Sequence, residues 1–169
     1  MQTINLELKR KLIAKTASKY FHSIIALPQW IRTDEKERTG IQVLVIEPGT
    51  RNLVMISVKD PSEAARFFAV EKAVRSDVLG DASSLNSGDE ENMKFAGSVT
   101  VYINEMKIQA SVSGLKAEDD VVIAIRILAA IFDITPKAII SNIRKNGGKL
   151  PPEFATKNHY SRTILSLRD

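Results

Sequence analysis

The sequence predicts an α+β fold in which an antiparallel sheet of two β-hairpins is packed by helices, in the order helix, hairpin, helix, hairpin, helix. Two regions, residues 41–58 and 99–112, each contain a pair of short strand-like segments separated by a turn. Stretches with helical spacing of apolar residues lie before, between and after these regions. A chain of 169 residues with 44% hydrophobic residues suits one domain with a core. We expect residues 1–148 to form this single domain and residues 149–169 to form a basic C-terminal extension.

The first helix is expected over residues 4–25, where apolar residues recur at spacings of three and four. Pro28 follows this segment and would end the helix, because proline lacks the backbone donor and clashes with the preceding turn. The apolar residues of the helix are these: Leu6, Ile13, Ala17, Tyr20, Phe21 and Ile24.

The first hairpin is expected to pair residues 41–46 with residues 53–58, which are both rich in β-branched and apolar residues. Pro48 and Gly49 lie between them and suit a type II turn, since glycine tolerates the positive φ that this turn requires. The sequence then returns to a helical pattern at residue 60.

The second helix is expected to begin at Asp60, which can cap it, with Pro61 in the first turn, and to end at Gly80. Its larger apolar residues form one stripe, with Ala64 and Phe68 beside it. The stripe consists of Phe67, Val70, Val74 and Val78. Residues 81–94 are polar and are expected to form an exposed loop within the domain.

The second hairpin is expected to pair residues 99–103 with residues 107–112, both of which alternate between apolar and polar residues. The turn at Asn104 and Glu105 lacks the glycine that such turns usually prefer. Two hairpins indicate an antiparallel sheet of four or more strands, which we expect helices to cover on one side.

Two helices are expected after the sheet. Residues 118–132 are apolar on most sides, so this helix should be buried against the sheet. Thr135 and Pro136 should begin a short final helix, with an inner face of Ala138, Ile139 and Ile143, that ends at residues 146–148.

Composition excludes several classes of chemistry. The chain contains no cysteine, which excludes disulfides, thiolate nucleophiles and cysteine-ligated metals. The N-terminus shows no signal-peptide pattern, and no apolar run is long enough to span a bilayer, so we expect a cytoplasmic protein without a membrane segment. Residues 137–169 hold seven basic and two acidic residues, a net charge of +5, whereas the other 136 residues sum to −1.

Few residues suggest a functional site. His22, one of only two histidines, could be an axial ligand or a general base, and the alternative is a surface side chain. Ser113, where the last expected strand ends, could contact a ligand, with ordinary turn and capping chemistry as the alternative. The carboxylates at residues 118–120 would splay around a helix and would not converge on one cation. No cofactor is identified, and the sequence does not decide whether the protein is an enzyme.

Several short motifs occur in a fixed order within residues 41–132. They are the first hairpin with its small turn at residues 47–49, the Ala-x-x-Lys-Ala segment at residues 69–73, Gly97, the Val-Ser-Gly ending at residues 112–114, and the acidic start of the next helix at residues 118–120. In these motifs the segment resembles the GlcG/HbpS-like haem-degrading domain family. The family's Gly-Gly-x-Pro segment is replaced here by residues 95–98, which contain no proline. The resemblance implies a profilin-like fold, oligomer formation, and binding of haem, a corrinoid or another small ligand if the altered loop still shapes a pocket.

Two functional hypotheses follow. The first is a non-catalytic module that binds haem or a related planar molecule and acts as a homo-oligomer. Its ligand-binding residues would be His22, Phe95, Gly97, Ser98 and Ser113. The second is an adaptor that binds a protein or nucleic-acid partner through its basic C-terminal segment. Its partner-binding residues would be Lys149, Lys157, Arg162 and Arg168.

Overall fold

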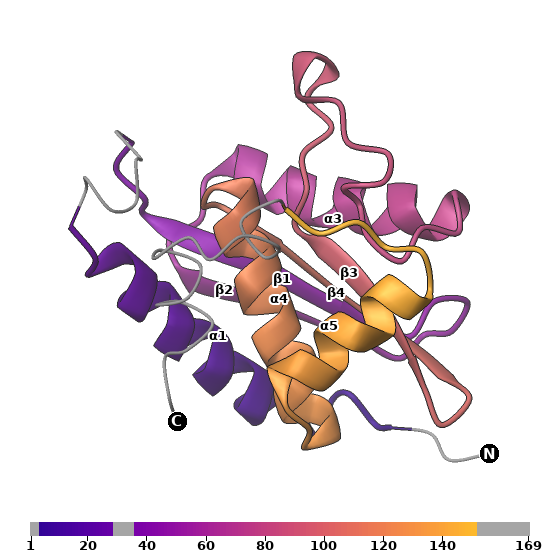
Figure 1. The fold of residues 1–169 in the computed structure, drawn as a ribbon. Coiled ribbons are helices and arrows are strands. Elements are labelled where there is room, and N and C mark those ends of the chain that lie inside the picture. Colours follow the sequence, from indigo (N-terminus) through magenta and orange to yellow (C-terminus); the bar gives the residue numbers. More distant parts are fainter. Residues whose placement is uncertain (1–3, 29–35, 152–169) are drawn as a thin grey trace.

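A computed structural model of the chain describes residues 4–28 and 36–151, and it contains a four-stranded sheet with helices on both faces (Figure 1). The helices are α1 (Arg10–Ile25), α3 (Glu63–Val78), the 3₁₀ helix η1 (Glu90–Asn92), α4 (Ala117–Phe132) and α5 (Pro136–Lys145). The strands are β1 (Gly40–Ile46), β2 (Leu53–Lys59), β3 (Ser98–Ile103) and β4 (Met106–Ser113). The predicted α+β class and the helix, hairpin, helix, hairpin, helix order are confirmed; the likeness to profilin stays a prediction.

All strand pairs are antiparallel, and the order across the sheet is β2-β1-β4-β3. The two hairpins are therefore joined through their inner strands. Val43 of β1 faces Ile56 of β2 on one side and Val112 of β4 on the other. This pairing places the start of β1 and the end of β4 side by side at one end of the sheet, which is where the candidate site lies.

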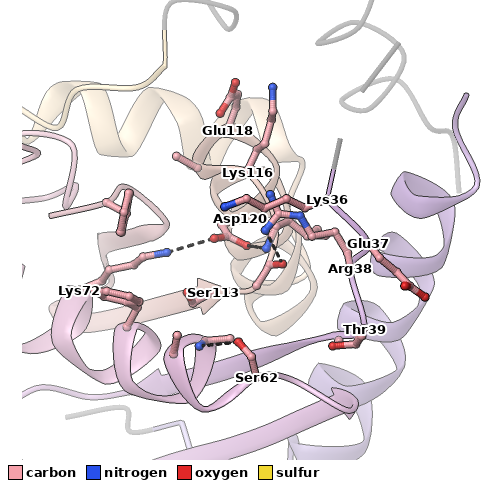
Figure 2. A pocket seen from close by; sticks show the side chains of 18 of the residues that line it. Lys36, Glu37, Arg38, Thr39, Ser62, Lys72, Ser113, Lys116, Glu118 and Asp120 are labelled. Carbon is pink, nitrogen blue, oxygen red and sulfur yellow. Dashed lines mark hydrogen bonds and ion pairs between the residues drawn. The ribbon is translucent and has the colours of Figure 1, made fainter. Parts of the chain in front are cut away.

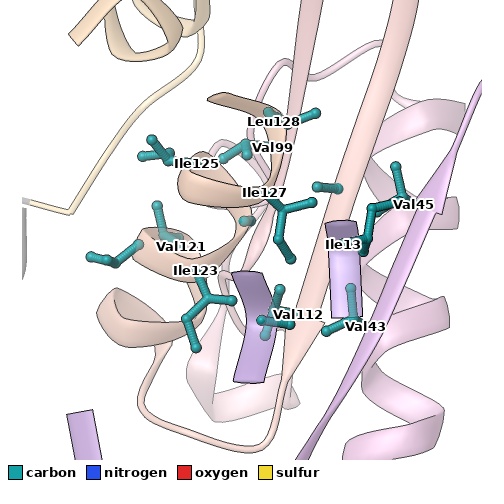
Figure 3. Packing of buried hydrophobic residues seen from close by; sticks show 14 of the residues in the cluster. Ile13, Val43, Val45, Val99, Val112, Val121, Ile123, Ile125, Ile127 and Leu128 are labelled. Carbon is teal, nitrogen blue, oxygen red and sulfur yellow. The ribbon is translucent and has the colours of Figure 1, made fainter. Parts of the chain in front are cut away.

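The sheet is covered on both faces, so the expectation that helices cover one side is wrong. Side chains alternate along each strand, and the two faces of this sheet differ in polarity. Val43, Ala110 and Val112 belong to the apolar core with α1 and α4 (Figure 3). Gln109 and Ser111 face the other way and bond to carbonyl groups of α3. The polar face of β4 is thus a second helix-packing surface.

Helix α1 begins at Arg10, six residues later than the expected boundary. Residues 6–9 form a turn instead, because side chains satisfy the backbone there. Asn5 accepts bonds from the N–H groups of Glu7 and Leu8. Asn52, in the turn of the first hairpin, accepts from the Leu6 N–H at 3.0 Å and donates to the Ile4 carbonyl at 2.6 Å. This N-terminal segment is held by the hairpin, a contact 46 residues distant in sequence.

Both predicted hairpins are confirmed. Gly49 in the first turn has a φ of +81°, as a type II turn requires. In the second turn, Asn104 and Glu105 have φ values of +49° and +66°. A two-residue turn with both φ angles positive matches the twist of the strands, and here it forms without glycine.

The second helix, α3, is capped by Ser62 and not by Asp60. The Ser62 hydroxyl accepts from the Ala65 N–H at 3.1 Å, and the helix begins at Glu63. The expected loop at residues 81–94 is only partly exposed. Ser83 and Ser84 are buried, and Ser84 exchanges bonds with Ser98 at the start of β3. The polar composition of this segment predicted full exposure, but these serines are buried because they lie against the edge strand β3.

The last two helices follow the prediction closely. Helix α4 is buried along most of its length between the sheet and its neighbours α1 and α5 (Figure 1). Thr135 caps α5, and Ile139 and Ile143 are its buried residues; Ala138, expected on that inner face, is exposed. None of the helices within residues 4–28 and 36–151 is both long enough and apolar enough to cross a membrane.

Candidate functional site

A cavity of about 660 Å³ opens at the end of the sheet where β1 begins and β4 ends (Figure 2). Its walls are residues 36–40, which lead into β1, the N-terminal part of α3 as far as Lys72, and residues 113–118 with Asp120, which run from the end of β4 into the first turn of α4. Glu90 and Phe95 complete it from the loop before β3. Segments from four parts of the chain thus converge on one space, and its volume lies within the usual range for a small-molecule site.

The inner wall of the cavity is a buried ion pair between Lys72 of α3 and Asp120 of α4. The Lys72 Nζ donates to Asp120 Oδ2 at 3.0 Å and to the carbonyl oxygen of Val112 at 2.9 Å. The two side chains are 1% and 2% exposed. A lone buried charge would be very costly, so each of these groups depends on the other. The pair therefore joins α3, β4 and the start of α4 behind the cavity.

Gly97 makes room for this ion pair. Its φ is +138°, and a Cβ atom built there would lie 2.6 Å from Lys72 Nζ and 2.5 Å from the Val112 carbonyl oxygen. Both the backbone conformation and the space exclude a larger residue. Gly114, at φ +137°, likewise has no room for a side chain, because a Cβ atom built there would clash with the carbonyl oxygen of Gly40. The two backbone segments are therefore in close contact at the mouth of the cavity.

Burial raises the pKa of the Asp120 carboxyl above its ordinary value. The charge and hydrogen bond of Lys72, the N–H of Leu115 and the charge of Arg38 all oppose this rise. The Leu115 N–H donates to Asp120 Oδ1 at 3.1 Å, so both carboxylate oxygens are hydrogen-bonded. Asp120 thus binds both Lys72 and the loop that leads into α4.

Charged side chains of both signs surround the opening. The basic lining residues are Lys36, Arg38, Lys72 and Lys116, and the acidic ones are Glu37, Glu90, Glu118 and Asp120. The Arg38 guanidinium donates to the Gly114 carbonyl oxygen at 3.3 Å. Figure 2 shows Lys36 and Arg38 directed toward Asp120 and the carboxylate of Glu37 directed away from it. Three cations therefore gather about one carboxylate at the inner end of the cavity, which favours an anionic group there.

Aromatic rings form one side of the cavity. Phe68 of α3 and Phe95 line it, with ring centroids 5.2 Å apart and planes at 90°. Such an edge-to-face pair presents apolar surface of fixed orientation. The cavity thus combines an apolar wall with a cationic inner end.

The structure brings together only part of the predicted ligand-binding set. Phe95 and Ser113 line the cavity, and Gly97 lies directly behind it against Lys72. Ser98 is buried under α3, where its N–H donates to the Ser84 hydroxyl, and it does not line the cavity. His22 is exposed on α1, on the opposite face of the sheet, and its Nδ1 lies 2.7 Å from the Ser18 carbonyl oxygen.

The predicted partner-binding residues lie at or beyond the end of the described chain. Lys149 is exposed, and its N–H donates to the Asn86 side chain at 2.7 Å. Lys157, Arg162 and Arg168 lie outside the described residues.

Sequence reasoning missed the residues that define the site most clearly, which are Lys72, Asp120 and Arg38. A signal for Lys72 is present in the sequence. It falls at helical spacing with the small residues Ala65, Ala69 and Ser76, and a lysine on a face of small residues indicates close packing around its stem. No comparable signal distinguishes Asp120 from its acidic neighbours.

Within residues 4–28 and 36–151, no group of three or more histidine or acidic side chains could hold a metal ion. Comparisons with protein-family models, with curated proteins and with solved structures found no match to this chain. The fold and the geometry of the cavity therefore carry the functional argument.

Proposed function

We propose that this protein is a small-ligand-binding module whose cavity takes a planar organic anion, with porphyrins as the first class to test. The observation that carries the proposal is the cavity of about 660 Å³ with two phenylalanine rings on one side and cations gathered at its inner end. A planar aromatic molecule with carboxylate groups complements both features.

The cavity has the construction expected of a binding site. Its inner wall is fixed by the Lys72–Asp120 pair, and its mouth by the close backbone contact of Gly114 with Gly40. A site fixed in advance loses little conformational entropy when a ligand binds. Arg38 suits carboxylate recognition, because its guanidinium can form two parallel hydrogen bonds.

The lining residues also indicate how a porphyrin would be held. The described residues around the cavity include no histidine, methionine, tyrosine or cysteine, which are the usual ligands of haem iron. Binding would therefore depend on the ring and its carboxylates. Haemin and metal-free protoporphyrin should bind with similar affinity, and His22 should not contribute.

The test is a titration of the protein with haemin and with metal-free protoporphyrin, followed by visible absorption and by fluorescence. Arg38→Met removes one positive charge from the cavity, and Arg10→Met removes one from α1 as a matched control. Loss of a charge-assisted bond should weaken binding by about tenfold or more in Arg38→Met alone. His22→Ala should bind as the wild type does.

Two outcomes would contradict this proposal. No saturable binding of either porphyrin would remove the ligand class. Binding of haemin that is lost in His22→Ala and kept in Arg38→Met would move the site to α1.

The alternative function is recruitment of a protein or nucleic-acid partner through the basic C-terminal segment. The concentration of positive charge in residues 137–169 favours it. Lys149 is exposed where the described chain approaches that segment. Such binding should weaken steeply with salt, whereas porphyrin binding in a part-apolar cavity should not.

A further inference from the structure

Arg75 of α3 is bonded to a loop that forms part of the cavity wall. The loop consists of residues 84–95, which project beside α3 (Figure 1). Its two limbs are joined near the tip by a pair of backbone hydrogen bonds. Phe95, at the base of one limb, and Glu90, near the tip, both line the cavity. The position of this loop therefore sets the shape of the ligand-binding space.

The guanidinium of Arg75 bonds to both limbs of the loop at once. Its Nη1 donates to the carbonyl oxygens of Ser84 and Ser87 at 3.1 and 2.8 Å, and its Nη2 donates to that of Phe95 at 2.8 Å. Nη1 also donates to the Ser87 hydroxyl at 3.1 Å. One side chain thus closes the base of the loop by binding backbone groups of its first and last residues.

Glu71, one turn before Arg75 on α3, orients the guanidinium and balances its charge. The Glu71 carboxylate accepts from Arg75 Nε at 2.6 Å and from Nη2 at 3.3 Å. The Arg75 side chain is only 9% exposed, and that of Glu71 is 23% exposed. A bidentate pair of this kind fixes the plane of the guanidinium, so that its remaining N–H groups are directed at the loop. The arrangement is therefore a clamp and not a solvated surface ion pair.

The Phe95 limb depends on this clamp more than the other limb does. The Ser84 limb is also bonded to the start of β3. Within residues 36–151, by contrast, the bond from Arg75 is the only hydrogen bond that the Phe95 backbone makes. The Phe95 ring packs against Phe68, with the ring centroids 5.2 Å apart. Without Arg75, this apolar contact alone would hold the ring in the cavity wall.

We propose that Arg75 is a positioning residue for the cavity, which acts on a ligand through the loop and the Phe95 ring. Arg75 itself does not line the cavity. The effect on binding rests on the proposed function, because it requires a ligand that contacts Phe95. The inference adds the residue that keeps the aromatic wall in place before a ligand arrives, which lowers the entropy cost of binding.

The first test measures the clamp without a ligand, by amide hydrogen exchange of the full chain. In Arg75→Met, exchange in residues 84–95 should become about tenfold faster or more, whereas exchange in α4, which reports on global unfolding, should not change. Arg66→Met is the matched control and should behave as the wild type does. Arg66 also lies on α3 and donates to a backbone carbonyl, that of Pro61, at 3.2 Å, away from the loop.

A second variant separates the clamp from the charge. Arg75→Lys keeps a positive charge beside Glu71, but an ammonium group has no planar fork that could bond to both limbs. Exchange in residues 84–95 should therefore also become faster in Arg75→Lys, although the ion pair on α3 is kept.

The second test is a cycle of binding measurements with metal-free protoporphyrin, followed by fluorescence. Phe95→Ala should weaken binding by about tenfold, and Arg75→Lys by roughly fivefold, because the ring is absent in the first variant and poorly placed in the second. The variant with both changes should bind about as weakly as Phe95→Ala alone, because Arg75 acts through that ring. A general loss of stability would instead weaken binding by the same factor in both backgrounds.

The two tests fail in different ways. Unchanged exchange in residues 84–95 of both Arg75 variants would overturn the clamp, whether or not the protein binds a porphyrin. Effects of Arg75→Lys and Phe95→Ala that multiply in the double variant would overturn the role in ligand binding. If the wild type binds no porphyrin while the loop exchanges faster in both Arg75 variants, the clamp is supported and the porphyrin proposal is wrong.

Discussion

The buried Lys72–Asp120 pair should be among the most sensitive points of the fold. Lys72→Met keeps much of the side-chain volume and removes the ammonium group, so the buried Asp120 carboxylate loses its ion-pair partner and keeps the Leu115 N–H and the charge of Arg38. Breaking a buried ion pair by removing one partner costs about 3–5 kcal/mol. A domain of this size has a free energy of unfolding of about 5–15 kcal/mol, so the loss is a large fraction of the total.

Urea unfolding followed by far-UV circular dichroism measures this loss. With a slope of about 2 kcal/mol per molar urea, the midpoint for Lys72→Met should fall by roughly 2 M. Lys107→Met is the matched control. Its ion pair with Asp77 has a shorter distance, 2.6 Å, but is part-exposed, and such pairs contribute about 1 kcal/mol or less.

A second substitution separates the charge effect from lost packing. In Lys72→Met/Asp120→Asn, the amide oxygen can still accept the Leu115 N–H, and no uncompensated charge remains. The double variant should be about 2 kcal/mol more stable than Lys72→Met alone. A loss in Lys72→Met no larger than in Lys107→Met, or a double variant less stable than the single one, would refute this account of the site.

Three further predictions concern titration, backbone space and the C-terminal segment. Burial raises the pKa of Asp120 above its unfolded value of about 3.8, so the folded protein binds more protons than the unfolded chain. The free energy of unfolding of the wild type, measured relative to that of Asp120→Asn by urea titration, should therefore increase as the pH falls toward 4. Gly97→Ala should lower the free energy of unfolding by about 2 kcal/mol or more, whereas Gly49→Ala, with open space around it, should cost about 1 kcal/mol by the same assay. Removing residues 152–169 should shift elution from a heparin column to lower salt if the basic segment binds polyanions, and unchanged elution would remove that role.

Much of the secondary structure could be predicted from the sequence, because its signals are local. The first hairpin is encoded by two β-branched segments around a proline–glycine turn, and Gly49 adopts the positive φ expected of it. The start of α5 is encoded by Thr135 and Pro136, whose capping bond joins residues three positions apart. In each case the stabilising contact lies within a few residues, so the pattern is sufficient.

The candidate site could be predicted only in part, since its members come from distant segments. Ser113 was identified from the end of its strand and Phe95 from the loop that the family resemblance indicates, and both line the cavity. Lys72 and Asp120 are 48 residues apart and meet only because α3 crosses the end of β4. His22 was predicted as a ligand because histidine can bind metals and transfer protons, but it lies on α1, on the opposite face of the sheet from the cavity.

The sequence by itself determined the strands, their turns and the burial of α4, because hydrophobic period and backbone preference act over short distances. The tertiary structure alone decided which side of α3 is buried. Helical period predicts a stripe but not the surface that it meets, and the face of β4 toward α3 presents Gln109 and Ser111. Those side chains require bonding partners and close approach, which small residues and backbone carbonyl groups provide. The apolar stripe therefore faces outward, and Lys72 faces inward to form the wall of the cavity.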